Sequence, residues 1–138
     1  MNGKLKLIVV TIVILIVGCK STKEVIYEPT DFKIEFGKSG GFTNVSMDYL
    51  INGDGNVYKH VEGDYSYVKT ISKKHLKELK QALKMKEFGK VTINEPGNMT
   101  YFINVKCPEF ENNIQWNDQS KADIANLIYD QLISILKN

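Results

Sequence analysis

The first nineteen residues constrain the chain most, because they decide which part of it is left to fold. Residues 1–6 carry two lysines and no acid, and residues 7–17 are apolar apart from one threonine. A basic start, an apolar stretch of about 7–15 residues and a small residue at its end are typical of a secretory signal peptide. A membrane-spanning helix needs about 20 apolar residues, and Lys20 and Lys23 follow too early for one. We therefore expect residues 1–18 to be a signal peptide that is removed.

The end of this segment, Ile16-Val17-Gly18-Cys19, resembles the lipobox of bacterial lipoproteins. The resemblance implies transfer of a diacylglyceryl group to the Cys19 sulfur, cleavage after Gly18 and acylation of the new amino terminus, for example with palmitate. Only cysteine suits this position, because its thiolate is the nucleophile that accepts the lipid. Two or three acyl chains anchor a protein stably, since each buried methylene contributes about 0.8 kcal/mol. Lys20 stands where aspartate often retains lipoproteins at the inner membrane, so we expect an extracytoplasmic, lipid-anchored protein on the cell membrane, on the outer membrane if the cell has one.

Loss of the signal changes the charge balance of the chain. All 18 basic residues are lysines and two leave with the signal, so 16 lysines remain against 16 acids. A nearly neutral chain without arginine does not suit nucleic-acid binding. With Cys19 lipidated, Cys107 has no partner for a disulfide, and its place at the end of a strand pattern indicates a small hydrophobic core residue.

Residues 19–30 are polar and lack a sustained period, so we interpret them as the lipidated cysteine and a flexible tether to a single domain at residues 31–138. In that domain, alternating apolar residues predict strands at residues 32–36, 45–51, 57–61, 101–107 and 113–117. Asn52-Gly53-Asp54-Gly55 suits a tight turn between antiparallel strands. The glycine-rich residues 37–41 are expected to interrupt the first strand.

Two amphipathic helices are also predicted. Ser72 is the expected N-cap of a helix over residues 73–85, with Leu76, Leu79 and Leu83 in its apolar stripe. Phe88 and Val91 are expected to pack behind that stripe. Ser120 is the expected N-cap of a helix that ends near Lys137. The inner face of that helix is expected to comprise Ile124, Ile128, Leu132 and Ile135, flanked by Leu127 and Leu136. The order β-β-β-α-β-β-α predicts an α+β fold, in which an antiparallel sheet of about five strands carries two helices on one face.

Motifs for catalysis and for metal binding are missing from the sequence. Neither His60 nor His75 belongs to a closely spaced ligand set, and there is no Gly-x-Ser-x-Gly elbow and no phosphate-binding loop. Residues 52–56 resemble the start of a calcium loop, but Val57 and Gly63 occupy the positions that require glycine and glutamate. We expect no catalytic residue, no metal and no cofactor, and both histidines at the surface.

Two loops are candidates for binding a partner. One contains Ser39, Gly40, Gly41, Phe42 and Thr43, and the other contains Glu95, Pro96 and Gly97. A loop stiffened by proline, or one that presents an apolar side chain, is suited to engaging another protein. Ordinary turn chemistry is the simpler explanation of the same residues, but both interpretations remain open at this point.

Ser39-Gly40-Gly41-Phe42-Thr43, placed after a first short strand and before a hairpin, helix, hairpin and closing helix, resembles emfourin, a family of small bacterial inhibitors of thermolysin-like metallopeptidases. The likeness spans about residues 32–136. Residues 94–98, with the Lys-, Ile- and Asn-rich composition, are similar to small uncharacterised lipoproteins of Bacteroidota-type bacteria. This chain departs from emfourin in its lipid anchor and tether, because the known type is a soluble partner of a co-produced peptidase. The resemblance implies a tethered inhibitor or sensor of extracytoplasmic metallopeptidases. The alternative is an envelope lipoprotein with a membrane-protein partner.

Overall fold

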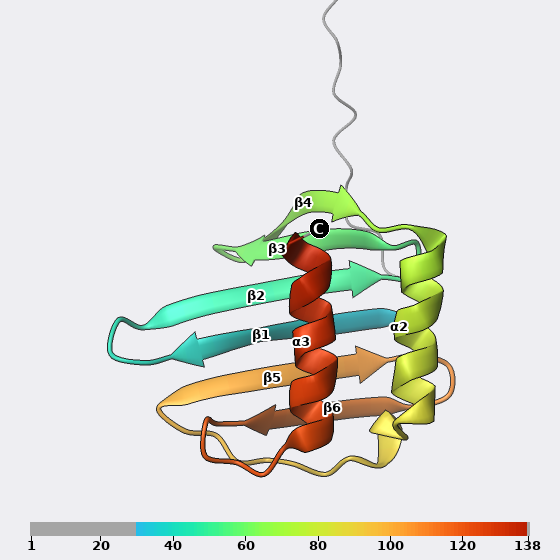
Figure 1. Ribbon diagram of the computed structural model, residues 1–138. Helices are drawn as coiled ribbons and strands as arrows, with labels where there is room; N and C mark the ends of the chain where they lie inside the picture. Colours follow the sequence, from blue (N-terminus) through green and yellow to red (C-terminus); the bar gives the residue numbers. More distant parts are fainter. Residues whose placement is uncertain (1–29, 138) are drawn as a thin grey trace, which may run out of the picture.

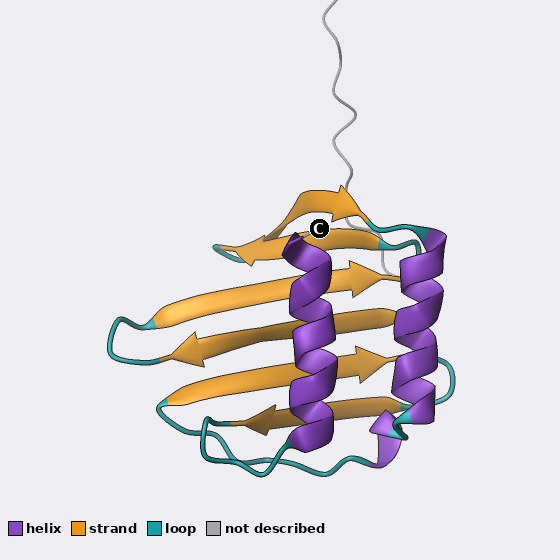
Figure 2. Ribbon diagram, in the orientation of Figure 1, coloured by secondary structure: helices purple, strands orange, loops and turns teal. Residues whose placement is uncertain are grey.

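The structure, a computed structural model, describes residues 30–137, so the expected signal peptide, cleavage site and lipidated Cys19 lie outside it. The described chain forms a six-stranded sheet with the strand order β4-β3-β2-β1-β5-β6, in which all neighbours are antiparallel. Two helices cross the strands on one face of the sheet (Figures 1 and 2). The predicted α+β class and the position of both helices on one face are confirmed.

The strands are β1 (Lys33–Gly40), β2 (Val45–Asn52), β3 (Asn56–Val61), β4 (Asp64–Thr70), β5 (Met99–Lys106) and β6 (Glu111–Trp116). The helices are α2 (Lys73–Met85), the short 3-10 helix η1 (Phe88–Lys90) and α3 (Asp123–Lys137). Neither α2 nor α3 nor any other helix of residues 30–137 has the length and apolar character to span a bilayer.

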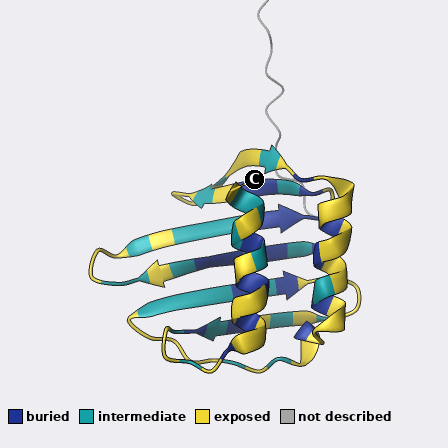
Figure 3. Cartoon of the chain, in the orientation of Figure 1, coloured by how far each residue is buried: buried dark blue, intermediate teal, exposed yellow. Residues whose placement is uncertain are grey.

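The core lies between the sheet and the helices because the strands alternate. In β1, Ile34 and Phe36 are fully buried toward the helices, whereas Lys33 and Glu35 lie on the other side and are partly exposed. The same alternation buries Ile103 and Val105 of β5, and Figure 3 shows which residues along the strands are buried. We call the sheet side without helices the open face.

The predicted count of about five strands was one short, because β4 is a sixth strand at one edge of the sheet. Its connection to β3 is a two-residue turn in which Glu62 and Gly63 both have positive φ, 52° and 95°. Turns of this type are normally marked by Asn-Gly or Asp-Gly, so Glu-Gly gives a weak signal. Strand β4 also buries few side chains, since Tyr67 and Val68 remain 40% and 45% exposed. Its sequence therefore shows little alternation of apolar and polar residues.

The expectation that residues 37–41 interrupt the first strand was also wrong. β1 continues through Gly40, which pairs with Val45 of β2 and with Met99 of β5. Hydrogen bonds from two neighbouring strands hold this segment extended despite the low strand propensity of glycine. At Gly37 the strands approach so closely that a Cβ atom would lie 1.8 Å from the Met47 carbonyl oxygen.

Helix α2 follows the prediction. The Ser72 hydroxyl accepts a hydrogen bond from the His75 amide at 3.2 Å, and Leu76, Leu79 and Leu83 are buried. Phe88 is fully buried behind them, and Val91 packs against the same core.

Helix α3 begins later and is turned relative to the predicted face. The Ser120 hydroxyl accepts the Asn117 amide at 3.1 Å, so it closes a separate turn and does not cap the helix. Ile128 and Leu132 are buried as predicted, and Ile135 and Leu136 pack against the core, but Ala125 and Tyr129 are buried as well. Ile124 and Leu127 are instead 39% and 53% exposed. Tyr129 accounts for the rotation, since its ring packs edge-on against Trp116 and Tyr101 at centroid distances of 5.7 and 5.4 Å.

The turn between β2 and β3 is confirmed as a hairpin turn. The Gly55 amide donates to the Asn52 carbonyl at 3.0 Å, and the Asn52 side-chain oxygen accepts from the amides of Asp54 and Asn56. Asn52 is buried, with 1% exposure, so its side chain serves the turn.

Candidate functional site

The two candidate loops lie next to each other at one end of the sheet. β1 pairs with β5, which places Gly40 opposite Met99, and the Gly41 amide donates to the Asn98 carbonyl at 2.7 Å. The loop between β1 and β2 extends beyond α3 in Figure 1, at the end of the sheet where β5 begins. Residues separated by about fifty positions in the sequence therefore form one surface.

The glycines of the first loop are required by this close approach. Gly40 and Gly41 have φ values of +102° and +77°, a region that side chains disfavour. A Cβ atom on Gly40 would lie 2.2 Å from the Asn98 carbonyl oxygen. The Asn44 amide donates to the Gly41 carbonyl at 3.1 Å and closes a tight turn with Phe42 and Thr43 at its centre.

Phe42 is the most exposed large apolar residue of the described chain, with its side chain entirely in solvent. Near its turn, the strand ends carry Val45, Met47 and Met99, which are half-buried on the helix side of the sheet. We call Phe42, Val45, Met47 and Met99 the apolar tip. An exposed aromatic side chain next to partly exposed apolar residues at a loop end is a feature of partner-binding surfaces.

The second loop is tied to the end of β6. The Asn117 side-chain amide donates to the Glu95 carbonyl at 2.8 Å, and Thr100 exchanges hydrogen bonds with the backbone of Gly97 at 3.0 and 3.1 Å. Glu95, Pro96 and Gly97 are all exposed. The loop thus has a fixed backbone and free side chains beside the apolar tip.

An aromatic cluster on the helix side supports this end of the sheet. Tyr101 stacks on Trp116 at 5.8 Å and donates its hydroxyl to Asp118 at 2.8 Å. This hydrogen bond, helped by burial, raises the pKa of Tyr101 above its ordinary value. Burial, with a smaller effect of Tyr101, raises the pKa of Tyr129 to about 12. Both phenols therefore stay protonated at neutral pH.

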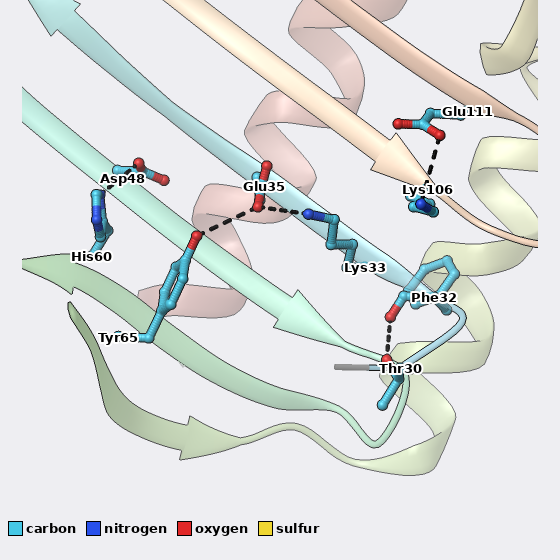
Figure 4. Close-up of polar contacts among 9 residues, drawn as sticks. All are labelled: Thr30, Phe32, Lys33, Glu35, Asp48, His60, Tyr65, Lys106 and Glu111. Carbon is cyan, nitrogen blue, oxygen red and sulfur yellow. Dashed lines mark hydrogen bonds and ion pairs between the residues drawn. The ribbon is translucent and has the colours of Figure 1, made fainter. Parts of the chain in front are cut away.

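A polar cluster that sequence reasoning missed lies on the open face (Figure 4). His60 Nδ1 is 3.2 Å from a carboxylate oxygen of Asp48, and Glu35 contacts Lys33 at 3.0 Å and the Tyr65 hydroxyl at 3.4 Å. Burial raises the pKa of Asp48, and the nearby His60 opposes that rise. The Asp48–His60 pair could have been predicted from the sequence. Extending the antiparallel register outward from the Asn52–Gly55 turn places Asp48 opposite His60.

The remaining predicted residues are placed as follows. His75 is exposed in the first turn of α2, as expected, but His60 is only partly exposed because it pairs with Asp48. Cys107 is a free thiol, half-buried against the core, and donates to the Phe110 carbonyl at 3.3 Å. Within residues 30–137, no three His, Cys, Asp or Glu side chains gather in a way that would hold a metal ion.

The fold and the paired loops define the chain as a small α+β domain with an exposed apolar tip at one end of its sheet. No protein-family model matches the chain, and no curated protein sequence matches it. The likeness to emfourin therefore rests on the Ser39–Thr43 motif and on the order of the elements.

Proposed function

We propose that the protein is a lipid-anchored, extracytoplasmic binding module without enzymatic activity, and that it engages a protein partner through the apolar tip. The observation that carries this proposal is the fully exposed Phe42 on a turn whose glycines are fixed against the second loop. A ring presented on a rigid turn loses little conformational freedom on binding. Aromatic anchors of this kind contribute much of the binding energy of many interfaces.

The position of the tip relative to the tether supports the proposal. The hydroxyl of Thr30, the first described residue, accepts the Gly53 amide at 2.8 Å, so the tether joins the end of the sheet where β1 begins. Phe42 lies beyond the opposite end of β1, whose eight residues span about 26 Å at 3.3 Å per residue. A tether at one end leaves the other end free to meet a partner.

We infer that the partner is a thermolysin-like metallopeptidase, because the Ser39–Thr43 motif that resembles emfourin includes Phe42 of the apolar tip. The test is titration of the full chain into several peptidases of this class. Slowed substrate cleavage at micromolar concentrations is expected. Phe42→Ala should weaken the effect at least about tenfold, the scale of a single interface anchor, whereas Met85→Ala, exposed on α2, should not. No slowing with any of these enzymes would eliminate inhibition.

The anchor has a separate test. Cys19→Ser should move the protein from the membrane fraction to the soluble extracytoplasmic fraction, because no thiolate remains to accept the lipid. Cys107→Ser is the matched control and should stay in the membrane fraction. Equal membrane association of both variants would contradict lipidation at Cys19.

A further inference from the structure

A second surface of the molecule has a different chemistry from the apolar tip. A groove of about 460 Å³ crosses β5 and β6 on the open face. Its lining includes Ser39, Thr100, Phe102, Asn104, Asn113 and Gln115, together with Asn94 and Ile114. The groove therefore offers hydroxyls, amides and one aromatic ring.

The strand register arranges these groups in rows. Asn104 lies opposite Asn113, and Phe102 lies opposite Gln115. Directly paired side chains of an antiparallel sheet have Cβ atoms about 4.5–5.5 Å apart. From Thr100 to Asn104 the groove follows β5 for about 13 Å. Paired polar groups along such a length suit a short chain of repeating polar units.

The amides are available to a ligand. Within the described residues, the Asn104 and Asn113 side chains make no hydrogen bond, and each amide can donate twice and accept twice. The Gln115 amide donates to Asn94 at 2.6 Å, which fixes its orientation at the groove edge. Hydroxyl groups of a ligand both donate and accept, so they match amides better than purely cationic or anionic groups do.

Phe102 supplies an apolar surface between these polar groups. It is half-buried, and its neighbour on β1 is Gly37, which places no side chain against the ring. No ring–ring contact of Phe102 occurs in the part of the chain that the structure describes. The ring is therefore open to the carbon–hydrogen face of a sugar, a common arrangement in sites that combine one aromatic surface with a few polar groups.

The groove is electrically neutral, although its own face carries charges. None of its lining side chains is ionisable. Charged residues beside the groove are paired: Glu35, which lies opposite Asn104, pairs with Lys33, and Lys106 pairs with Glu111 (Figure 4). Farther away on the same face, His60 pairs with Asp48. This distribution favours a neutral ligand over an acidic or a basic one.

We propose that this groove binds a neutral oligosaccharide, whose hydroxyls bond to Asn104, Asn113 and Gln115 and whose ring face stacks on Phe102. The site is separate from the apolar tip and does not depend on it. Phe42→Ala is accordingly expected to leave sugar binding unchanged, so failure of one proposal does not imply failure of the other.

The test is saturation-transfer NMR on the full chain in a detergent without a sugar head group. The probes are the neutral tetrasaccharides of cellulose, chitin and starch, with trigalacturonate as the acidic comparison and a neutral Gly-Ser peptide as the non-sugar comparison. At least one neutral sugar should receive saturation, most strongly at its ring C–H protons. The double variant N104A/N113A should bind about tenfold more weakly.

Two further variants complete the design. Phe102→Leu keeps an apolar side chain but removes the ring, and it should abolish the preference for ring protons. Gln81→Ala, an exposed amide on α2, should bind like the parent chain. Circular dichroism confirms that each variant is folded. Absence of saturation with every neutral sugar, equal binding by N104A/N113A and the parent, or stronger binding of trigalacturonate or of the peptide would overturn the proposal.

Discussion

Gly40 shows how a single residue shapes the proposed binding end. Two independent reasons require glycine at this position. Its φ is +102°, and a Cβ atom would lie 2.2 Å from the Asn98 carbonyl oxygen. The first is a property of the local backbone. The second arises only because β1 lies beside β5, so it belongs to the tertiary structure.

Gly40→Ala is expected to destabilise the domain more than Gly63→Ala. Both substitutions carry the strain of positive φ, about 1–3 kcal/mol, but a Cβ on Gly63 meets nothing within 4 Å. Urea unfolding of the two variants gives the difference, which measures the close approach of the loops alone. Equal destabilisation would show that the two loops are not held together as described.

The Ser-Gly-Gly-Phe turn can be predicted from the sequence, because a pair of glycines indicates a local backbone with positive φ. Its proximity to Glu95-Pro96-Gly97 is not visible, because it depends on the pairing of β1 with β5, and these strands are separated by most of the domain. The paired amides of Asn104 and Asn113 were missed for the same reason. A single asparagine in a strand does not indicate a binding site. The two become a candidate site only when the register between β5 and β6 places them opposite each other.

At the scale of elements, α3 shows that apolar periodicity alone does not predict which face of a helix is buried. Its sequence offers more apolar residues than one face can bury, and the pattern alone favours Ile124 over Tyr129. The aromatic cluster decides otherwise, because a ring placed among Phe36, Tyr101 and Trp116 covers more surface than an isoleucine would. Strand β4 was missed because an edge strand with exposed side chains has little alternation to detect.

Two leucines of α3 test the observed face. Leu132→Ala should cost about 2–5 kcal/mol, because Leu132 is fully buried. Leu127→Ala should change the free energy of unfolding by no more than about 0.5 kcal/mol, because Leu127 is 53% exposed. Chemical denaturation of both variants measures the contrast. A large loss at Leu127 would contradict the observed orientation of α3, in which this flanking residue is exposed.

The contact between α3 and the sheet should also depend on alkaline pH. Burial raises the pKa of Tyr129 to about 12 in the folded chain, whereas an unfolded chain ionises tyrosine near its ordinary pKa of about 10. The unfolded state therefore releases its proton first, and stability should fall as pH rises from about 10 to 12. Unfolding measured at pH 9 and pH 11 should show a smaller loss for Tyr129→Phe than for the parent, and an equal loss would contradict burial of this phenol.

At the scale of the whole molecule, the domain presents three surfaces. The helices cover one face of the sheet, the open face carries paired charges and the neutral groove, and the apolar tip projects from the end opposite Thr30. With the proposed tether attached near Thr30, the apolar tip would face away from the proposed anchor. The proposed function requires that this end of the sheet bind a protein partner.

Photocrosslinking in the producing cell tests this binding. A benzoylphenylalanine placed at position 42 or at position 96 should give one discrete crosslinked protein, whereas the same group at position 85 on α2 should not. Identification of the captured protein by mass spectrometry separates a peptidase from an envelope component. No discrete product at positions 42 and 96, or the same product at position 85, would contradict the account.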